Sequence, residues 1–338
     1  MIARESTVNT PVLAAGLSAR AIDPARALGG VRGVNAARPA HTARPVDRLL
    51  AVYNLLLAGL WTSVTVAAEP AATGSGLAFE LGPGKASLLA MAHLIAAGIP
   101  LLVGRLPRSP GFGSRLLRLL HEVYPLLLLP VFWLELDPLI RTLHGTTRDA
   151  AIMGLDRAVF GFHLDQVWIR AMPQTWFSEL MHFSYWIYLP LIFTPPIVMV
   201  LRRDAVGLQD VTLRLLATYV GCYVVYLAFP TAGPKVFGVL FEGARDGIFL
   251  GLVARAHETG NVYGAAFPSS HVAGAVTVAW LGWRWFPPAA AVLLTLQAAG
   301  VLMSTVYTQN HYAVDSLAGL GFALAVQAWV VPTLRGRQ

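Results

Sequence analysis

The fold is decided by residues 267–315, which read FPSSHVAGAVTVAWLGWRWFPPAAAVLLTLQAAGVLMSTVYTQNHYAVD. This stretch holds two apolar runs, 271–286 and 288–306, and Phe286-Pro287-Pro288 between them predicts a tight turn. Apolar runs that approach about 20 residues can cross a bilayer as helices. The stretch therefore predicts a pair of membrane helices, with the polar residues at its two ends on the same side of the membrane.

The rest of the chain repeats this pattern. Of its 338 residues, 56% are hydrophobic and only 13% are charged, whereas soluble domains carry about 25% charged residues. We therefore expect an all-α fold, a polytopic membrane helical bundle with about eight transmembrane helices. The expected spans are 47–68, 86–104, 116–134, 176–200, 211–230, 271–286, 288–306 and 312–332.

The basic residues predict the orientation of these spans. With the N-terminus in the cytoplasm, about two thirds of the 25 Lys and Arg residues fall in cytoplasmic segments, as the positive-inside rule requires. The even number of spans also places the C-terminus in the cytoplasm. The net charge of +7 therefore reflects topology, and we expect no nucleic-acid partner. The single cysteine, Cys222, excludes a disulfide framework and a cysteine-based metal cluster.

The segment between the third and fourth spans predicts an amphipathic helix at the membrane surface. Arg148-Asp149 opens a stretch, about 148–172, in which apolar residues recur among Asp156, Arg157 and Asp165. Two interpretations stay open at this point. The helix is either a linker that packs on the bundle or a lid that admits lipid to a site.

Three polar stretches stand at the ends of spans on the extracytoplasmic face. They are residues 229–235 (FPTAGPK), 267–271 (FPSSH) and 304–315 (STVYTQNHYAVD). The first two flank one outer loop, and the third follows two spans later, so all three lie on one membrane face. Each stretch alone has an ordinary structural explanation, but their joint occurrence on one face favours a catalytic site.

Each stretch suits a phosphate group. Ser269 predicts a helix N-cap, the free N–H groups of that first turn favour an anion, and the hydroxyl of Ser270 adds a donor. His311 and Asp315 share one helix face, so the carboxylate can hydrogen-bond one ring nitrogen and leave the other to attack phosphorus. Lys235 supplies positive charge for the phosphoryl oxygens. No cluster has metal-ligand spacing, so we expect no metal.

These motifs resemble those of the type 2 phosphatidic acid phosphatase superfamily, whose signature is K-x6-R-P, then P-S-G-H, then S-R-x5-H-x3-D. Pro268-Ser269-Ser270-His271 matches the second motif, and Ser304-Thr305 with His311 and Asp315 matches the spacing of the third. The resemblance implies a six-helix core without metal or other cofactor. It also implies that His311 is the nucleophile that forms a phosphohistidine, that His271 is the general acid, and that Asp315 orients His311.

The departures from the signature are informative. Ser270 replaces the Gly of the second motif, Thr305 replaces the Arg of the third, and the first motif is reduced to Gly233-Pro234-Lys235. Loss of that Arg, together with the run Asn310 to Asp315, is similar to the lipid phosphotransferase branch that includes the inositol phosphorylceramide synthases. The residues that could replace the Arg are Lys235, Arg245, Arg255 and Arg148.

The first 45 residues are rich in Ala, Arg, Pro and Gly, which predicts a disordered cytoplasmic tail (1–45). The resemblance divides the rest into two additional transmembrane helices (46–105) and a six-helix catalytic core with the interfacial helix (106–338). We expect an integral protein of a bacterial plasma membrane that transfers a phosphoryl group or phospho-headgroup from a phospholipid or lipid phosphate to water or an acceptor alcohol. A simple lipid-phosphate or polyprenyl-phosphate phosphatase is one alternative. A non-catalytic lipid transporter or binding protein is another, and the scarcity of charges within the expected spans does not favour it.

Overall fold

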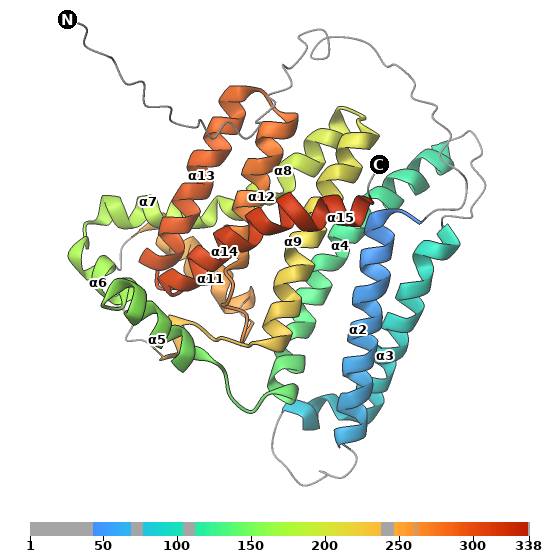
Figure 1. Cartoon of the computed structure of the whole chain (residues 1–338), viewed down its shortest axis with the longest axis horizontal. Coiled ribbons are helices and arrows are strands. Elements are labelled where there is room, and N and C mark those ends of the chain that lie inside the picture. Colours follow the sequence, from blue (N-terminus) through green and yellow to red (C-terminus); the bar gives the residue numbers. More distant parts are fainter. Residues whose placement is uncertain (1–42, 69–76, 104–111, 238–246, 261, 337–338) are drawn as a thin grey trace, which may run out of the picture. The chain divides into compact units, whose positions relative to one another are not determined.

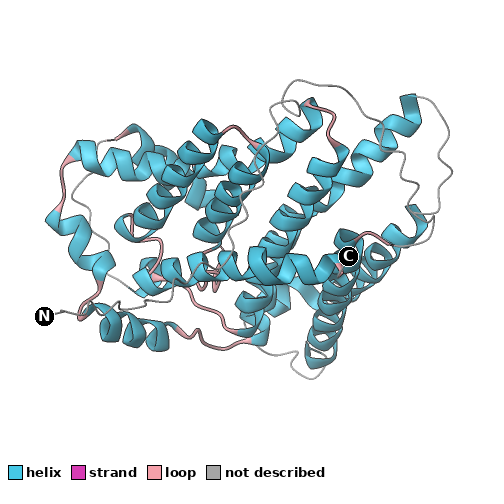
Figure 2. Ribbon diagram, turned by 45° about the horizontal axis from the view of Figure 1, so that its top comes forward, coloured by secondary structure: helices cyan, strands magenta, loops and turns pink. Residues whose placement is uncertain are grey.

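The computed structural model describes residues 43–68, 77–103, 112–237, 247–260 and 262–336 (Figure 1). The expected tail, 1–45, therefore lies almost wholly outside the described residues. The described part of the chain contains helices and loops but no strand (Figure 2). Six of its helical segments are long and apolar enough to cross a membrane. The prediction of an all-α, polytopic membrane helical bundle is confirmed.

The helices follow one another with short connections. Their bounds are α2 Pro45–Ala68, α3 Leu77–Val103, α4 Phe112–Leu143, α5 Asp149–Phe160, α6 Leu164–Ala171, α7 Thr175–Trp186, α8 Tyr188–Leu201, α9 Ala205–Ala228, α10 Pro234–Phe237, α11 Ile248–Gly260, α12 Ser270–Trp285, α13 Pro288–Tyr307, α14 Ala313–Ala325 and α15 Val331–Arg335. A π-helical turn, Val326–Val330, joins α14 to α15.

Six of the eight expected spans coincide with the long apolar segments. These segments are Pro45–Val66, Leu119–Leu143, Thr175–Leu201, Ala205–Ala228, Pro288–Tyr307 and Ala313–Arg335. The other two expected spans also form helices, but with shorter apolar parts. In α3 the apolar part is Gly84–Pro100. Helix α12 has 16 residues, which at 1.5 Å per residue is about 24 Å, less than the hydrocarbon core of about 30 Å.

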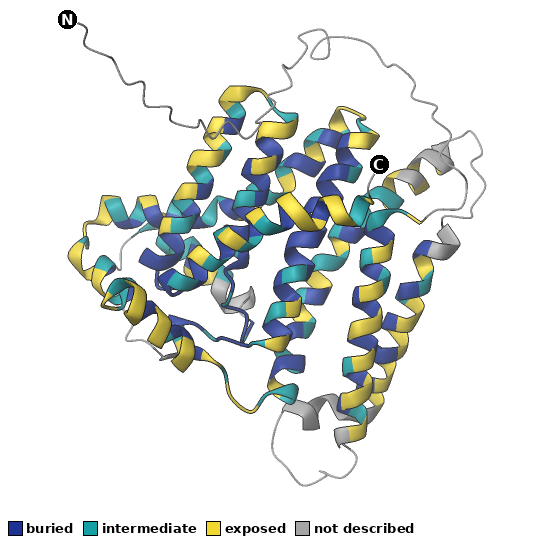
Figure 3. Cartoon of the chain, viewed as in Figure 1, coloured by how far each residue is buried: buried dark blue, intermediate teal, exposed yellow. Residues whose placement is uncertain are grey.

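Helix α9 is the central helix of the bundle. Burial within the protein reaches 78% of its apolar window, whereas the other long segments reach at most 39% (Figure 3). Helices α4, α8 and α12 pack against it. The outer faces of the surrounding helices expose large apolar side chains such as Leu88, Ile95 and Leu293. Apolar side chains on the outside of a helical bundle suit contact with lipid tails.

A buried polar network joins the first three helices of the described chain. The His93 ring contacts the Glu135 carboxylate at 2.7 Å and the Asn54 side-chain oxygen at 2.8 Å, and the Trp61 indole donates to Glu135. We expected the third span to end at residue 134, and α4 instead continues to Leu143. The spans therefore carry more charge than we expected, since Glu135 lies within one of them.

Two helix breaks also differ from expectation. The fourth expected span, 176–200, is divided at Ile187 into α7 and α8, and Pro195 and Pro196 both lie within α8. Pro190 explains this position, because its ring clashes with the carbonyl four residues earlier, where α7 ends. The expected interfacial helix at 148–172 is divided into α5 and α6. Gly161, with φ +80°, ends α5 in a left-handed conformation that favours glycine.

The divided interfacial segment packs on the bundle. Helix α5 lies against α14, and α6 lies against α13 (Figure 1). Ile169 of α6 is buried in a small cluster with Met181 of α7 and Tyr307 of α13. By contacts, Ala43–Gln338 form one unit that includes both the 46–105 pair and the 106–338 core. The division between these two parts stays a prediction.

Candidate active site

The three polar stretches meet at one end of the bundle through backbone hydrogen bonds. The Ser269 N–H donates to the Asp315 carbonyl at 3.0 Å, which joins the start of α12 to the first turn of α14. Thr231 of the first stretch makes two backbone hydrogen bonds with the loop before α12. The Thr231 N–H donates to the Gly264 carbonyl at 3.0 Å, and the Ala266 N–H donates to the Thr231 carbonyl at 2.8 Å.

Gly233 places the first stretch directly against the third. Its φ is +89°, and a Cβ at this position would lie 3.2 Å from both the Ala266 Cβ and the Asn310 carbonyl oxygen. Only glycine combines this backbone conformation with so close an approach. The buried carboxylate of Asp149 accepts the N–H groups of Ala232 at 2.9 Å and Gly233 at 2.8 Å. The first turn of α5 therefore fixes the loop that carries Lys235.

His271 lies in the first turn of α12 between two tyrosines of the fourth span. Its ring stacks on Tyr185 with a centroid distance of 4.8 Å and lies 5.1 Å from the Tyr188 ring. The Tyr185 hydroxyl is 3.0 Å from His271 Nε2. His271 Nδ1 is buried and has no hydrogen-bond partner among the described residues. This nitrogen is therefore the one left to exchange a proton with a ligand.

His311 lies beside His271, and the two ring centroids are 5.8 Å apart. A tight turn after α13 holds it there, because the N–H groups of Asn310 and His311 both donate to the Thr305 carbonyl at 3.0 Å. At this separation, one phosphoryl group can contact both rings. The structure thus brings together the two imidazoles that the sequence places 40 residues apart.

Lys235, in α10, acts electrostatically on this pair. Burial and the positive charge of Lys235 lower the pKa of the His311 imidazole to about 4, although a hydrogen bond with the backbone of Ala266 acts in the opposite direction. Burial also lowers the pKa of the Lys235 ammonium group to about 7. Near neutral pH, His311 is therefore uncharged, and an uncharged imidazole nitrogen keeps the lone pair that a nucleophile needs.

Asp315 faces His311 but does not hydrogen-bond its ring. His311 Nδ1 is 3.7 Å from Asp315 Oδ2, longer than a hydrogen bond, and Nδ1 has no other partner among the described residues. The reason is that Asp315 Oδ2 accepts the Tyr312 backbone N–H at 3.0 Å, as the third residue of a capping arrangement at the start of α14. The carboxylate thus stabilises the helix start and faces Nδ1 at the same time.

The serines of the second stretch make several hydrogen bonds within the protein, whereas phosphate binding by the Ser270 hydroxyl stays a prediction. Ser269 caps α12, since its hydroxyl accepts the Val272 N–H, and both Ser269 and Ser270 are buried. The Ser270 N–H donates to the Tyr226 hydroxyl at 3.1 Å, and that hydroxyl donates to the Pro268 carbonyl at 2.8 Å. Three first-turn N–H groups that we expected to be free, those of Ser269, Ser270 and Val272, already have partners.

The position of the missing Arg is filled by a buried hydroxyl. Thr305 is fully buried, and its hydroxyl contacts the Ser316 hydroxyl of α14 at 2.8 Å. This contact joins the end of α13 to the first turn of α14. Among the expected replacements, Lys235 acts on His311, whereas the side chains of Arg148 and Arg255 are exposed. Arg245 lies outside the described residues.

Sequence reasoning missed two residues that position the site. Tyr185 lies within an apolar span, and no spacing rule linked it to His271. Asp149 follows Arg148 in the interfacial segment, and its contact with the loop before Lys235 depends on tertiary structure alone. The described residues also include one group that could hold a metal ion, Asp156, His163 and Asp165, on α5 and α6. These three residues lie outside the paired-histidine site.

The fold and the site together define a polytopic helical membrane protein with a paired-histidine centre at one end of its bundle. The family model of the PAP2 superfamily matches residues 150–329, which include both histidines and Asp315. The chain belongs to this superfamily, the type 2 phosphatidic acid phosphatases. Membership supports phosphatase-type enzyme activity on lipids, in an integral membrane protein. No curated protein and no solved structure matches the chain.

Proposed function

We propose that this protein transfers a phosphoryl group or phospho-headgroup from a membrane lipid by way of a phosphohistidine at His311. The observation that carries the proposal is the pairing of His271 and His311, whose ring centroids are 5.8 Å apart, with the positive charge of Lys235 acting on His311. Two imidazoles that contact one phosphoryl group can supply a nucleophile, here His311, and a general acid, here His271.

The reaction proceeds in two balanced steps. His311 Nδ1 faces Asp315 and makes no hydrogen bond, so the hydrogen bond of the ring with the backbone of Ala266 belongs to Nε2. Nε2 attacks once the proton is on Nδ1, where it faces Asp315, and the phosphoryl group replaces the contact with Ala266. The Nε2–P bond forms as the bond from phosphorus to the leaving alcohol breaks, and His271 gives its proton to the alcohol oxygen. Water or a second alcohol then attacks phosphorus, loses its proton to His271, and releases His311 as the N–P bond breaks. Lys235 balances the negative charge of the phosphoryl oxygens in both steps.

Transfer to an alcohol is favoured over hydrolysis by the departure at Thr305. A buried Thr–Ser contact occupies the position where the hydrolytic signature has Arg. The same departure is typical of the inositol phosphorylceramide synthase-like branch. Simple hydrolysis of a lipid or polyprenyl phosphate is the second candidate, and superfamily membership favours it.

One paired assay separates these candidates. Purified protein is given phosphatidic acid without an acceptor, or phosphatidylinositol with ceramide, and products are measured as free phosphate or as headgroup-transferred lipid. A transferase forms the second product and releases little phosphate from the first substrate. Release of phosphate at a rate unaffected by ceramide would establish the hydrolase instead. The variant His311→Ala is expected to abolish either activity, and full turnover by it would overturn the proposed mechanism.

We further propose that the site faces the extracytoplasmic side and that both termini are cytoplasmic, on the basis of the distribution of Lys and Arg. The native Cys222 is buried, so it gives little background to a membrane-impermeant thiol reagent. Exposed Ala158 on α5 and exposed Ala205 at the start of α9 suit single replacements by Cys. Ala158→Cys is expected to react in intact cells and Ala205→Cys only after lysis. The reverse pattern would place the site in the cytoplasm.

A further inference from the structure

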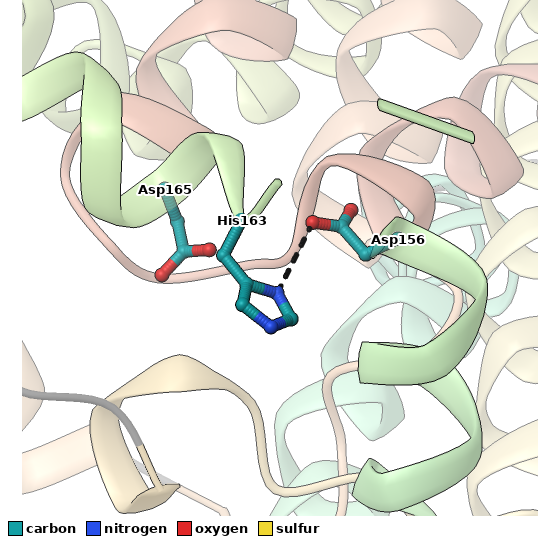
Figure 4. A group of neighbouring side chains, drawn as sticks. All are labelled: Asp156, His163 and Asp165. Atoms are coloured by element: carbon teal, nitrogen blue, oxygen red, sulfur yellow. Dashed lines mark ion pairs between the residues drawn. The ribbon is translucent and has the colours of Figure 1, made fainter. Parts of the chain in front are cut away.

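A second cluster of titratable side chains lies at the junction of α5 and α6, outside the paired-histidine site. Asp156 is 0% exposed and Asp165 is 1% exposed. His163 immediately precedes α6 and directs its ring between the two carboxylates (Figure 4). One ligand atom from each residue lies within 4.8 Å of the other two, and His163 Nδ1 is 3.7 Å from Asp156 Oδ2.

Each of the three residues keeps one polar atom without a partner. Asp156 Oδ2, His163 Nδ1 and Asp165 Oδ1 are buried and make no hydrogen bond within the described part of the chain. The second oxygen of each carboxylate is occupied, because Asp156 Oδ1 accepts the Val314 N–H at 3.1 Å and Asp165 Oδ2 accepts the Gln166 side-chain amide at 2.6 Å. The unpaired atoms therefore form a cluster of three.

Such a cluster is unfavourable without a counter-charge. Asp156 and Asp165 are buried carboxylates, each with one oxygen unpaired within the described part of the chain, and such groups are costly to ionise. No Lys or Arg forms an ion pair with either carboxylate among the described residues. A bound cation would offset both negative charges and satisfy all three unpaired atoms at once.

We propose that Asp156, His163 and Asp165 bind one divalent transition-metal ion, of the Zn²⁺ or Mn²⁺ type. Two carboxylates and one imidazole are the ligands such ions use, whereas Ca²⁺ prefers oxygen alone. Bonds of about 2.1 Å at tetrahedral angles hold donor atoms about 3.4 Å apart. The three donor atoms lie within 4.8 Å of one another, so binding would bring the most distant pair closer by at most about 1.4 Å. Water completes the coordination from the partly exposed side of His163.

The neighbouring Arg157 sets one condition on this site. Its Nη2 is 3.4 Å from His163 Nε2. A metal on Nδ1 requires the proton to be on Nε2, and two donors then face each other. Arg157 is exposed, so its side chain can turn outward when the ion binds. Arg157 thus contacts the His163 ring in this structure but does not bind the ion, because a guanidinium group offers only N–H donors.

The ion would fasten the interfacial segment to the helix that carries Asp315. Asp156 accepts the N–H of Val314, which directly precedes Asp315 and lies three residues after His311. A metal on Asp156 thus fixes α5 and α6 against the first turn of α14. The ion acts here as a structural clamp beside the phosphoryl-transfer site, and it takes no part in the transfer itself.

Metal binding is tested on tag-free protein purified in detergent. Elemental analysis is expected to find about one Zn or Mn per chain, and protein stripped with a chelator is expected to regain one equivalent on titration with Zn²⁺ or Mn²⁺ but not Ca²⁺. His163→Ala and Asp165→Asn are each expected to weaken binding at least about tenfold, the smallest loss reported even for outer-sphere partners. Rebinding is expected to raise the melting temperature of the wild type and not of these variants.

Arg157→Ala is the matched control, because it changes the same ring environment without removing a ligand, and it is expected to bind metal like the wild type. His311→Ala is also expected to keep its metal, which separates this test from the proposed reaction. Stripped wild type that takes up no ion would overturn the proposal in favour of a proton held between the two carboxyls. Equal binding by wild type, His163→Ala and Asp165→Asn would overturn it in favour of adventitious metal elsewhere.

Discussion

Replacement of Lys235 by Arg is expected to change the pH dependence of the reaction in a defined direction. Burial lowers the pKa of Lys235 to about 7, and that of His311 is lowered to about 4. The active form needs His311 uncharged and Lys235 charged, so kcat/KM should be maximal between these values. Above the pKa of Lys235 the charged fraction falls tenfold per pH unit, so at pH 9 about 1% remains and kcat/KM falls about 100-fold.

Arginine stays charged throughout this range. The kcat/KM of Lys235→Arg should therefore stay level from pH 7 to pH 9, even if its maximum is lower than that of the wild type. The assay is the initial rate at low lipid concentration in mixed micelles, with Lys235→Gln as a control that lacks the charge at every pH. A wild-type profile that stays level to pH 9, or a Lys235→Arg profile with the same alkaline fall, would refute this assignment.

Three further substitutions test the positioning of the site. Asp315→Asn should keep the melting temperature, because an amide oxygen can still accept the Tyr312 N–H. The same variant should lower kcat at least about 100-fold. A kcat equal to that of the wild type would show that the carboxylate charge is unimportant. Gly233→Ala should lower the free energy of unfolding by about 1–2 kcal/mol, since φ is +89°. Gly154→Ala, whose new methyl group would meet nothing within 4 Å, should not, and equal losses would contradict the account. Tyr185→Phe removes the hydroxyl 3.0 Å from His271 Nε2 and keeps the aromatic ring. The kcat of this variant should fall about three- to tenfold at constant KM. A change in KM alone would indicate a role of Tyr185 in lipid binding instead.

Six of the expected spans could be located because each is a long apolar run. The expected span 288–306 became α13, Pro288–Tyr307, since Pro287-Pro288 sets its start and polar residues follow its end. Two spans separate His271 from His311, and this even number was enough to predict that both lie on the same side of the membrane. Their separation of 5.8 Å depends on tertiary contacts, such as that between Ser269 and Asp315.

Other features depend on contacts between segments that no local pattern records. The contact of Asp149 with Gly233 and that of Glu135 with His93 each join distant helices. Gly161 lies within the amphipathic stretch and could have indicated the break. Apolar residues recur on both sides of it, however, and this pattern favours one continuous helix. The two helices on either side of that break carry Asp156 and Asp165, whose side chains lie close together.

The central claim is that His311 becomes covalently phosphorylated during turnover. The direct measurement is a rapid acid-free quench of the enzyme with lipid labelled at phosphorus, followed by peptide mapping of the alkali-stable label. The account predicts label on the peptide that contains His311 and none in His311→Ala. In His271→Ala the label should form more slowly and also be lost more slowly, because the first step lacks its acid and the second its base. Turnover with no label on that peptide, or label that persists in His311→Ala, would contradict it.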